Sequence, residues 1–506
     1  MAEEEKKPEG EKKSEEKKPE PKDNLIESKH RINIRGKELH YTVTAGTIVL
    51  KEETGDREKE SEGEKPKAQV FFIAYTLDGV ADKSNRPITF SFNGGPGSSS
   101  VWLHLGLLGP RRVDMGDAGS LLPPPYHLVD NEYSLLDQTD LVFIDPVSTG
   151  YSRPVEGQKA KEFHGFKKDI ESVGDFIRLY ATRYQRWTSP KFLAGESYGT
   201  TRAAGLSGYL QERHGMYLNG IMLVSAILDF GTADFFPGHD LPYIMFLPTY
   251  AATARYHGKV TTHGSLPNFL KEVEEFALGE YTLALLKGFA LTEDERDRII
   301  TKLAQYTGLT EEYIDRTDLR INIFRFCKEL LRDRRRTVGR LDSRFTGIDR
   351  DAAGEVFEED PSMSAITGPY TATFYDYVRG ELKYENDLPY EILTPKVWPW
   401  SYAEFENRFV NVAETLRKAI SNHQALRVHI ANGYYDLATP YLATQYTFGH
   451  MGLEKTLQNN ISMSYYEAGH MMYVHMPSIK QLSENLVNFI RSSSRPSLQM
   501  PLPDIS

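Results

Sequence analysis

Ser197 stands at the centre of the pattern G-x-S-x-G, formed by residues 195–199 (GESYG). A short apolar run that begins at Lys191 precedes this pattern, and residues 200–215 follow with the apolar spacing of a helix. A strand, a glycine-flanked serine and a helix in this order predict a sharp turn that presents the serine hydroxyl as a nucleophile. The alternative is an ordinary Gly/Ser loop, because a five-residue pattern also occurs by chance.

A serine hydroxyl becomes a good nucleophile only when a positioned base takes its proton and an acid orients that base. On a sheet with a nucleophile turn, the acid and then the base follow later strands. Asp436 comes directly after the predicted strand 425–431, and His470 comes after a second strand that begins near Met463. The sequence therefore predicts a triad of Ser197, Asp436 and His470.

Other residues compete for the roles of acid and base. The chain holds 14 histidines, and a lone histidine is usually structural. His429 lies within an apolar strand and His475 lies just beyond the candidate base. Their positions relative to the strands therefore disfavour both as the catalytic base. The rival acids are Asp240, Asp349 and Asp351, which would place the acid in an inserted segment.

A glycine-rich loop, residues 93–100 (NGGPGSSS), follows a predicted strand at residues 87–92. In a serine hydrolase, free N–H groups of such a loop can bind the oxyanion that forms during the reaction. A plain glycine-rich turn is the alternative. A phosphate-binding loop is disfavoured, because the lysine of G-x-x-x-x-G-K-[ST] is absent.

Composition narrows the class of protein. The chain has 506 residues, is 40% hydrophobic and has a net charge of -11, which favours a large packed core and argues against a nucleic-acid partner. The basic cluster at residues 332–336 has acidic neighbours and is interpreted as a solvated helix face. Cys327 is the single cysteine, so no intrachain disulfide or thiolate metal cluster is expected. No metal or cofactor is expected.

The sequence has no apolar run of membrane-spanning length and no apolar signal-peptide core near its N-terminus. We therefore expect no membrane association and a cytoplasmic location, or a periplasmic or secreted one if a signal peptide had been removed. The sequence does not indicate an oligomeric state.

Strands and helices alternate along much of the chain, which is typical of a mostly parallel α/β sheet flanked by helices. Predicted strands cover 31–50, 69–77, 87–92, 141–145, 191–197, 220–228 and 425–431. Predicted helices cover 161–187, 200–215, 267–289, 293–306, 405–421 and 481–492. A charged stretch, residues 51–67, is expected to form a long hairpin loop between the first two strands.

The predicted domain organisation is a core with an insertion. Residues 1–23 form a disordered Lys/Glu/Pro tail, 24–231 and 396–492 the core, 232–395 a largely helical cap, and 493–506 a flexible C-terminal tail. Within the cap, residues 358–369 are expected to wall the active site.

Four motifs in this order resemble those of the serine carboxypeptidases, peptidase family S10, of bacterial type. They are FNGGPGSSS, GESYG, NGYYDLATP and AGHMM, and the resemblance covers residues 30–492. It implies the α/β-hydrolase fold with an inserted cap. It also implies cleavage of the C-terminal residue from a peptide substrate.

The resemblance also implies further site residues. The backbone N–H groups of Gly95 and Tyr198 would form the oxyanion hole. Asn93, Gly94 and Glu196 would bind the substrate's terminal carboxylate, and Met471 would line the leaving-group pocket.

Three positions depart from the family pattern. Ser91 and Leu107 stand where familiar members have a Trp and a Glu that help hold the substrate carboxylate, and Ser98 replaces a cysteine. Arg202, just inside the helix after the nucleophile, could compensate by binding a carboxylate, or could instead form an ion pair that packs this helix. The alternatives to a carboxypeptidase are an esterase or acyltransferase, and an inactive binding homologue.

Overall fold

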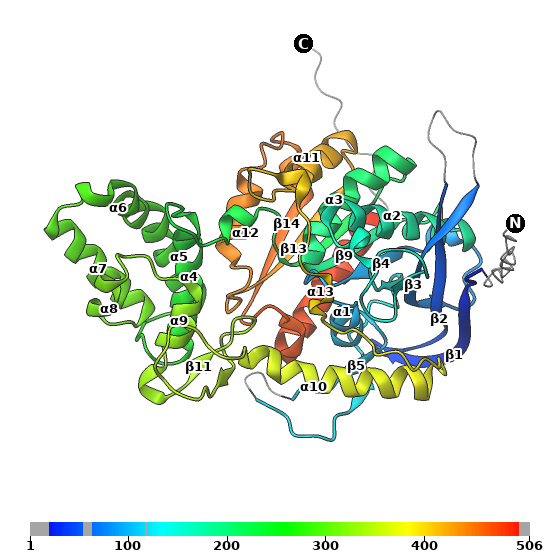
Figure 1. The fold of residues 1–506 in the computed structure, drawn as a ribbon, viewed down its shortest axis with the longest axis horizontal. Helices are drawn as coiled ribbons and strands as arrows, with labels where there is room; N and C mark the ends of the chain where they lie inside the picture. Colours follow the sequence, from blue (N-terminus) through cyan, green and yellow to red (C-terminus); the bar gives the residue numbers. More distant parts are fainter. Residues whose placement is uncertain (1–19, 54–62, 117–119, 495–506) are drawn as a thin grey trace, which may run out of the picture.

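The computed structural model describes residues 20–53, 63–116 and 120–494. Its centre is a ten-stranded sheet with the order β1-β2-β3-β7-β4-β9-β10-β13-β14, and β8 pairs with β3 (Figure 1). The strands are β1 (Asn24–Ile34), β2 (Lys37–Glu53), β3 (Glu64–Leu77), β4 (Ile88–Phe92), β7 (Asp140–Ile144), β8 (Arg153–Pro154), β9 (Lys191–Ser197), β10 (Gly220–Ala226), β13 (Arg427–Gly433) and β14 (Ile461–Tyr466). Strands β7, β4, β9, β10, β13 and β14 run parallel, and β1 to β3 are antiparallel.

The N-terminal strands differ from the prediction in one respect. The predicted single strand 31–50 is two strands, because the chain turns back at Arg35 and Gly36, whose φ angles are 50° and 79°. β1 then pairs with β2 along its whole length. The turn was missed because Arg35 is an unusual residue for a left-handed backbone conformation. β2 and β3 also extend into the charged stretch, where Lys51 pairs with Pro66.

Helices cover both faces of the sheet. Successive side chains of one strand point to opposite faces, so neighbouring residues pack against different helices. Leu193 of β9 packs in one core with α2 (Phe166–Arg183), α3 (Tyr198–His214) and α11 (Ala413–Asn422). The neighbouring Phe192 packs in the other core with α13 (Met476–Ser494). This arrangement confirms the predicted α/β sheet flanked by helices.

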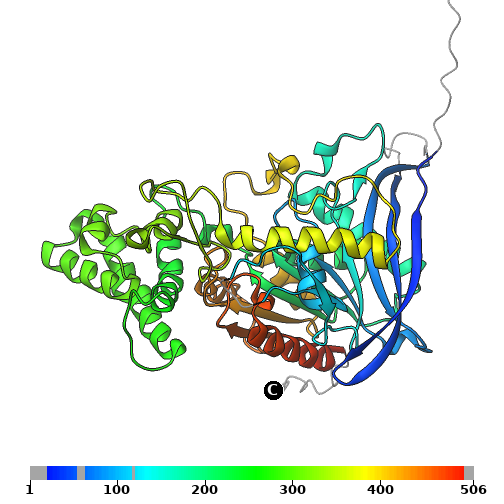
Figure 2. The same ribbon diagram turned by 90° about the horizontal axis from the view of Figure 1, so that it is seen from below.

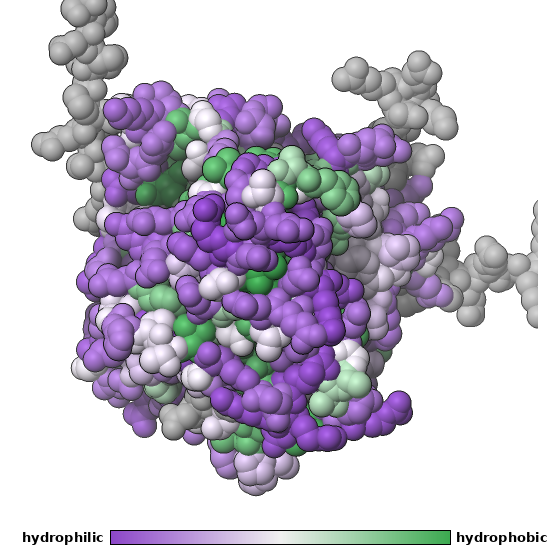
Figure 3. Space-filling model, turned by 90° about the vertical axis from the view of Figure 1, so that its left-hand side faces the viewer, coloured by the Kyte–Doolittle hydropathy of each residue, from purple (hydrophilic) through white to green (hydrophobic). Residues whose placement is uncertain are grey.

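A helical lobe, residues 241–331, lies to one side of the sheet (Figure 1). Its helices are α4 (Leu241–Tyr256), α5 (Leu266–Phe276), α6 (Thr282–Lys287), α7 (Glu293–Thr307), α8 (Glu311–Arg316) and α9 (Ile323–Glu329). They share a hydrophobic core that also includes Tyr441 of α12 (Tyr441–Gly449). The end of the lobe is mostly hydrophilic with scattered apolar side chains (Figure 3).

Helix α10 (Pro361–Asp376) comes after the helical lobe in the chain and runs along the sheet domain towards β1 and β2 (Figure 2). Ile366, Tyr370 and Phe374 of α10 belong to the same core as β1 to β3. The predicted cap, residues 232–395, therefore contains a lobe that shares its core with α12 and a helix that packs on the sheet. The division of the chain into core and cap stays a prediction.

The remaining elements are short or lie close to their predicted positions. They are α1 (Val101–Leu103), β5 (Arg111–Val113), β6 (Leu128–Asp130), β11 (Thr337–Val338) and β12 (Thr346–Gly347). The predicted helix 405–421 is shorter at its start, because α11 begins only after Asn411, whose side chain accepts a hydrogen bond from the N–H of Ala413. Residues 1–19 of the predicted tail 1–23, residues 495–506 of the predicted tail 493–506, and residues 54–62 of the predicted hairpin loop lie outside the described residues.

Candidate active site

Ser197 lies at the junction of β9 and α3, in the sharp turn that the sequence predicts. Its backbone has a φ of 59° and a ψ of -131°, a conformation that residues with a side chain rarely adopt. The flanking glycines permit the turn. A Cβ at Gly195 would lie 2.2 Å from the carbonyl oxygen of Gly199, and a Cβ at Gly199 would lie 2.8 Å from that of Phe92.

His470 and Asp436 form a buried pair, 3% and 0% exposed, in the loops after β14 and β13. Nδ1 of His470 donates to Oδ2 of Asp436 at 2.8 Å, since an ionised carboxylate only accepts. The other carboxylate oxygen, Oδ1, accepts from the N–H groups of Ala438 and Thr439. The Thr439 hydroxyl donates to Oδ2 at 2.6 Å, so the acid is fixed from several sides.

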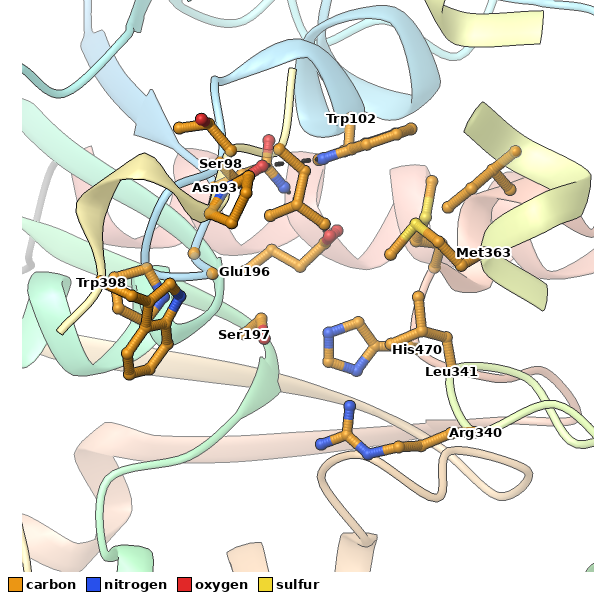
Figure 4. Close-up of a pocket in the computed structure, with 18 residues that line it drawn as sticks. Asn93, Ser98, Trp102, Glu196, Ser197, Arg340, Leu341, Met363, Trp398 and His470 are labelled. Atoms are coloured by element: carbon orange, nitrogen blue, oxygen red, sulfur yellow. Dashed lines mark hydrogen bonds between the residues drawn. The ribbon is translucent and has the colours of Figure 1, made fainter. Parts of the chain in front are cut away.

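The pKa of His470 reflects two opposing influences. Burial alone would lower it, but the charge of Asp436 and the hydrogen bond to it outweigh burial, so the pKa lies above its usual value. With Nδ1 committed to Asp436, Nε2 is the ring nitrogen left for the pocket. Figure 4 shows the imidazole and the Ser197 hydroxyl facing each other.

Ser197 and His470 open into a cavity of about 450 Å³. Its lining consists of residues 93–96, Ser98, Trp102, Glu196, Ser197, Arg340, Leu341, Met363, Ile366, 393–395, Trp398, His470 and Met471. The predicted site residues Asn93, Gly94, Gly95, Glu196 and Met471 are all in this lining. Met363 and Ile366 come from the segment 358–369 that was expected to wall the site.

Glu196 lies beside the nucleophile and is almost completely buried. Asn93 Nδ2 donates to its Oε1 at 3.0 Å, and the phenol of Tyr473 donates to its Oε2 at 2.6 Å. Burial is the largest influence and raises the pKa of Glu196 to about 7, against the lowering effects of His470, Tyr473 and Asn93. A carboxyl with this pKa can hold or release a proton near neutral pH.

The glycine-rich loop lies against the start of α3. A Cβ at Gly94 would lie 2.4 Å from the backbone nitrogen of Tyr198, so only glycine allows this approach. The N–H of Gly95 forms no hydrogen bond with another residue in the described part of the chain. The N–H of Tyr198 is in the first turn of α3, where N–H groups have no partner within the helix.

The rival bases and acids form hydrogen bonds or ion pairs with residues outside the cavity. Both ring nitrogens of His429 are hydrogen-bonded to serines of β14, and burial lowers its pKa to about 4. His475 is hydrogen-bonded to Ser478. Asp240 forms an ion pair with Arg320. Asp349 pairs with Lys328, whose ammonium also donates to the carbonyl oxygen of Asp351.

Arg202 forms the ion pair that was the alternative to carboxylate binding. Its Nε donates to Asp169 at 2.8 Å, its Nη1 donates to the carbonyl oxygen of Asn93, and its side chain is 1% exposed. The guanidinium thus supports the Asn93 loop from behind. Ser91 and Leu107, the two departures from the family pattern, are fully buried and are not among the residues that line the cavity.

Four side chains in or next to the cavity escaped the sequence analysis: Trp102, Arg340, Trp398 and Tyr473. Trp102 Nε1 donates to the hydroxyl of Ser98 at 2.8 Å. Tyr473 lies three residues after the predicted base, and that proximity was the one signal for it. Arg340 lies far from every predicted motif in the sequence.

A clasp formed by residues 340–344 joins the loops of the acid and the base. The N–H of Leu437 donates to the carbonyl oxygen of Arg340, and the N–H of His470 donates to that of Leu341. Asp342 accepts a hydrogen bond from the N–H of Gly469 and forms a buried ion pair with Arg344. Residues 340–344 therefore help to hold both loops.

Residues 20–53, 63–116 and 120–494 contain no group of three or more His, Cys, Asp or Glu side chains arranged to hold a metal ion. Within the same ranges, no helix has the length and apolar character needed to cross a bilayer.

Comparisons with known proteins agree with these motifs. The family model of serine carboxypeptidase matches residues 60–235. The pheromone-processing carboxypeptidase KEX1 of Saccharomyces cerevisiae is 32% identical over 161 residues, which are 30% of this chain and 20% of that protein. Serine carboxypeptidase-like 45 of Arabidopsis thaliana is 25% identical over 212 residues, 38% of this chain and 42% of that protein. The chain thus matches about a fifth of the length of the KEX1 relatives.

The fold extends beyond the matched segment. A crystal structure of a KEX1 protein, a prohormone-processing carboxypeptidase from Saccharomyces cerevisiae, superposes with a TM-score of 0.54 at 16% identity. The superposition covers 89% of this chain and 91% of that chain, which confirms the α/β-hydrolase fold. The matched segment 60–235 contains both the glycine-rich loop and the nucleophile turn. Over residues 60–235, the chain is thus similar to the serine carboxypeptidase family.

Proposed function

We propose that the protein is a serine carboxypeptidase that removes the C-terminal residue of a peptide through an acyl-enzyme. The observation that carries this proposal is the Asp436–His470 hydrogen bond of 2.8 Å, with the imidazole facing Ser197 in the shared cavity (Figure 4). A base held in one orientation by a buried acid is what a serine nucleophile requires.

In the proposed reaction, Nε2 of His470 takes the proton of the Ser197 hydroxyl as Oγ attacks the carbonyl carbon of the last peptide bond. The N–H groups of Gly95 and Tyr198 donate to the oxyanion of the tetrahedral intermediate. His470 then gives the proton to the leaving amine, and the acyl-enzyme remains. Water attacks this ester in the same way, with His470 again acting as base and then as acid.

The terminal carboxylate of the substrate would bind beside Ser197, at Asn93, Gly94 and Glu196. A protonated Glu196 can donate a hydrogen bond to a carboxylate, whereas an ionised one would repel it. The pKa of about 7 supports this role, because much of Glu196 is protonated at and below neutral pH. Met471, which lines the cavity and is largely buried, would contact the departing residue.

An esterase or acyltransferase is the second candidate. It is favoured by the buried Ser91 and Leu107, since the side chains that strengthen carboxylate binding in familiar members are absent from these places. The same triad accepts an alcohol or an amine as leaving group. An inactive binding homologue is disfavoured, because all three triad positions are filled.

Two measurements test the proposal. A fluorophosphonate probe should label the parent and fail to label Ser197→Ala. Steady-state kinetics should then compare one peptide with a free and an amidated C-terminus, beside an aryl ester. A carboxypeptidase prefers the free C-terminus, and equal rates on both peptides with fast ester hydrolysis would favour the esterase.

A further inference from the structure

Arg340 is a cation at the cavity that the proposed reaction does not use. Its backbone is fixed in the clasp, where its N–H donates to Asp360 at 3.1 Å and its carbonyl oxygen accepts from Leu437 at 3.0 Å. Its side chain is partly exposed and extends into the cavity near Ser197 and His470 (Figure 4). The backbone of Arg340 is thus held in the same loop that holds the acid and the base.

The guanidinium of Arg340 has no acceptor among the described residues. Within the part of the chain that the structure describes, it forms no ion pair and donates no hydrogen bond, whereas nearby Arg344 is paired with Asp342. The other carboxyl of the cavity, Glu196, is already bonded to Asn93 and Tyr473. A partly desolvated guanidinium with five free donors is well suited to bind a carboxylate of a ligand.

The location of Arg340 indicates which part of a substrate it meets, an argument that rests on the proposed function. Asn93 and Glu196, where the terminal carboxylate would bind, lie on one side of Ser197, and Arg340 lies on the opposite side (Figure 4). A peptide that reacts at Ser197 and places its last residue near Asn93 must direct the preceding residue away from it. That residue approaches Arg340.

We infer that Arg340 is a specificity-determining residue that selects substrates with an acidic side chain immediately before the scissile bond. The Arg340 guanidinium would pair with the carboxylate of an Asp or Glu at that position. Basic side chains there would be repelled, because the cavity offers no free carboxylate on this side among the described residues. The preferred substrates are therefore peptides with an acidic penultimate residue.

Aryl esters of N-acylated amino acids provide a direct test. They have no terminal carboxylate, so they report the acyl side alone and do not depend on carboxypeptidase activity. We expect kcat/KM for the Glu ester to exceed that for the Gln ester by about tenfold, as a charge-assisted hydrogen bond gives. Arg340→Gln should remove this preference, Arg340→Lys should retain part of it, and Arg340→Glu should shift it to the Lys ester. Arg336→Gln is the matched control, since Arg336 is exposed and outside the cavity.

The outcomes separate this inference from the proposed function. An unchanged Glu/Gln ratio in Arg340→Gln would overturn the inference. A loss that is equal for all peptides with a free C-terminus, with ester ratios unaffected, would assign Arg340 to the terminal carboxylate and also overturn it. A parent that hydrolyses esters with the acidic preference but ignores peptides would refute the carboxypeptidase and leave the role of Arg340 supported.

Discussion

The phenol of Tyr473 donates a hydrogen bond of 2.6 Å to Oε2 of Glu196, and both side chains are buried. This hydrogen bond stabilises the ionised form of Glu196 and so lowers its pKa, against the larger effect of burial. Tyr473 thereby influences the pH at which the carboxyl next to the nucleophile loses its proton.

We predict that Tyr473→Phe shifts the pH dependence of peptide binding to higher pH. In the parent, Glu196 is protonated below a pH of about 7, and KM for a free-carboxyl peptide should rise as the pH increases through that value. Loss of the phenol raises the pKa of Glu196, so the increase in KM should begin at higher pH. Peptide KM measured from pH 5 to 9 checks this, with Tyr466→Phe as control. A shift to lower pH would contradict it.

Glu196→Gln should change ester hydrolysis as well as peptide binding. The charge of Glu196 raises the pKa of His470, so its removal lowers that pKa. His470 must be neutral to act as a base, and the acidic limb of ester kcat/KM should therefore move to lower pH. At the same time, peptide KM should become independent of pH near 7. An acidic limb that does not move would show that the two groups titrate independently.

Substitutions in the triad should have unequal effects. Ser197→Ala and His470→Ala should each reduce kcat by roughly 10⁶-fold, and Asp436→Asn by about 10⁴-fold, because the acid only orients and stabilises the base. Kinetics with an active-site-titrated parent measure these ratios. His429→Ala is the control and should retain activity. Full activity of the His470 variant would assign the base to another histidine, such as His475.

Gly94→Ala should damage the proposed oxyanion hole without removing any side chain. The new Cβ would lie 2.4 Å from the backbone nitrogen of Tyr198, so the loop must move away from α3. We expect kcat to fall by roughly 10²–10³-fold, the usual effect of losing one oxyanion donor. Gly279→Ala is the control, because a Cβ there meets nothing within 4 Å. Unchanged kcat in Gly94→Ala would remove this loop from transition-state binding.

Asp342→Ala should lower both stability and turnover. It leaves the guanidinium of Arg344 buried without its partner and removes an acceptor from the N–H of Gly469. Breaking such a buried pair lowers the free energy of unfolding by about 3–5 kcal/mol. Urea unfolding and kcat of the folded fraction measure the two effects. The control is Asp333→Ala, because the Asp333 side chain is 61% exposed and its pair with Lys259 should contribute less than about 1 kcal/mol. Equal losses in both variants would contradict the role of the clasp.

Local signals explain which parts could be predicted. The sharp turn at Ser197 depends on two glycines within five residues, and Asp436 and His470 each follow an apolar strand. These local patterns allowed all three residues to be predicted from the sequence. The turn at Arg35 was missed, because the residues on both sides of it have strand character and Arg is not a usual turn residue.

Long-range contacts explain what could not be predicted. Tyr473 and Glu196 are 277 positions apart, and nothing near either residue indicates the other. The role of α10 was missed for a similar reason, because its apolar residues suit a lobe core as well as the sheet core that they actually join. Arg340 could be related to the triad only from the structure, in which residues 340–344 contact the loops of Asp436 and His470.

The clasp of residues 340–344 has a consequence for how such enzymes can diversify. A lid attached only by flexible hinges could be exchanged between relatives as an independent module. Here residues 340–344 donate and accept backbone hydrogen bonds with the loops that carry Asp436 and His470. A chimera that takes the helical lobe from a relative must therefore keep residues 340–344 together with the native loops.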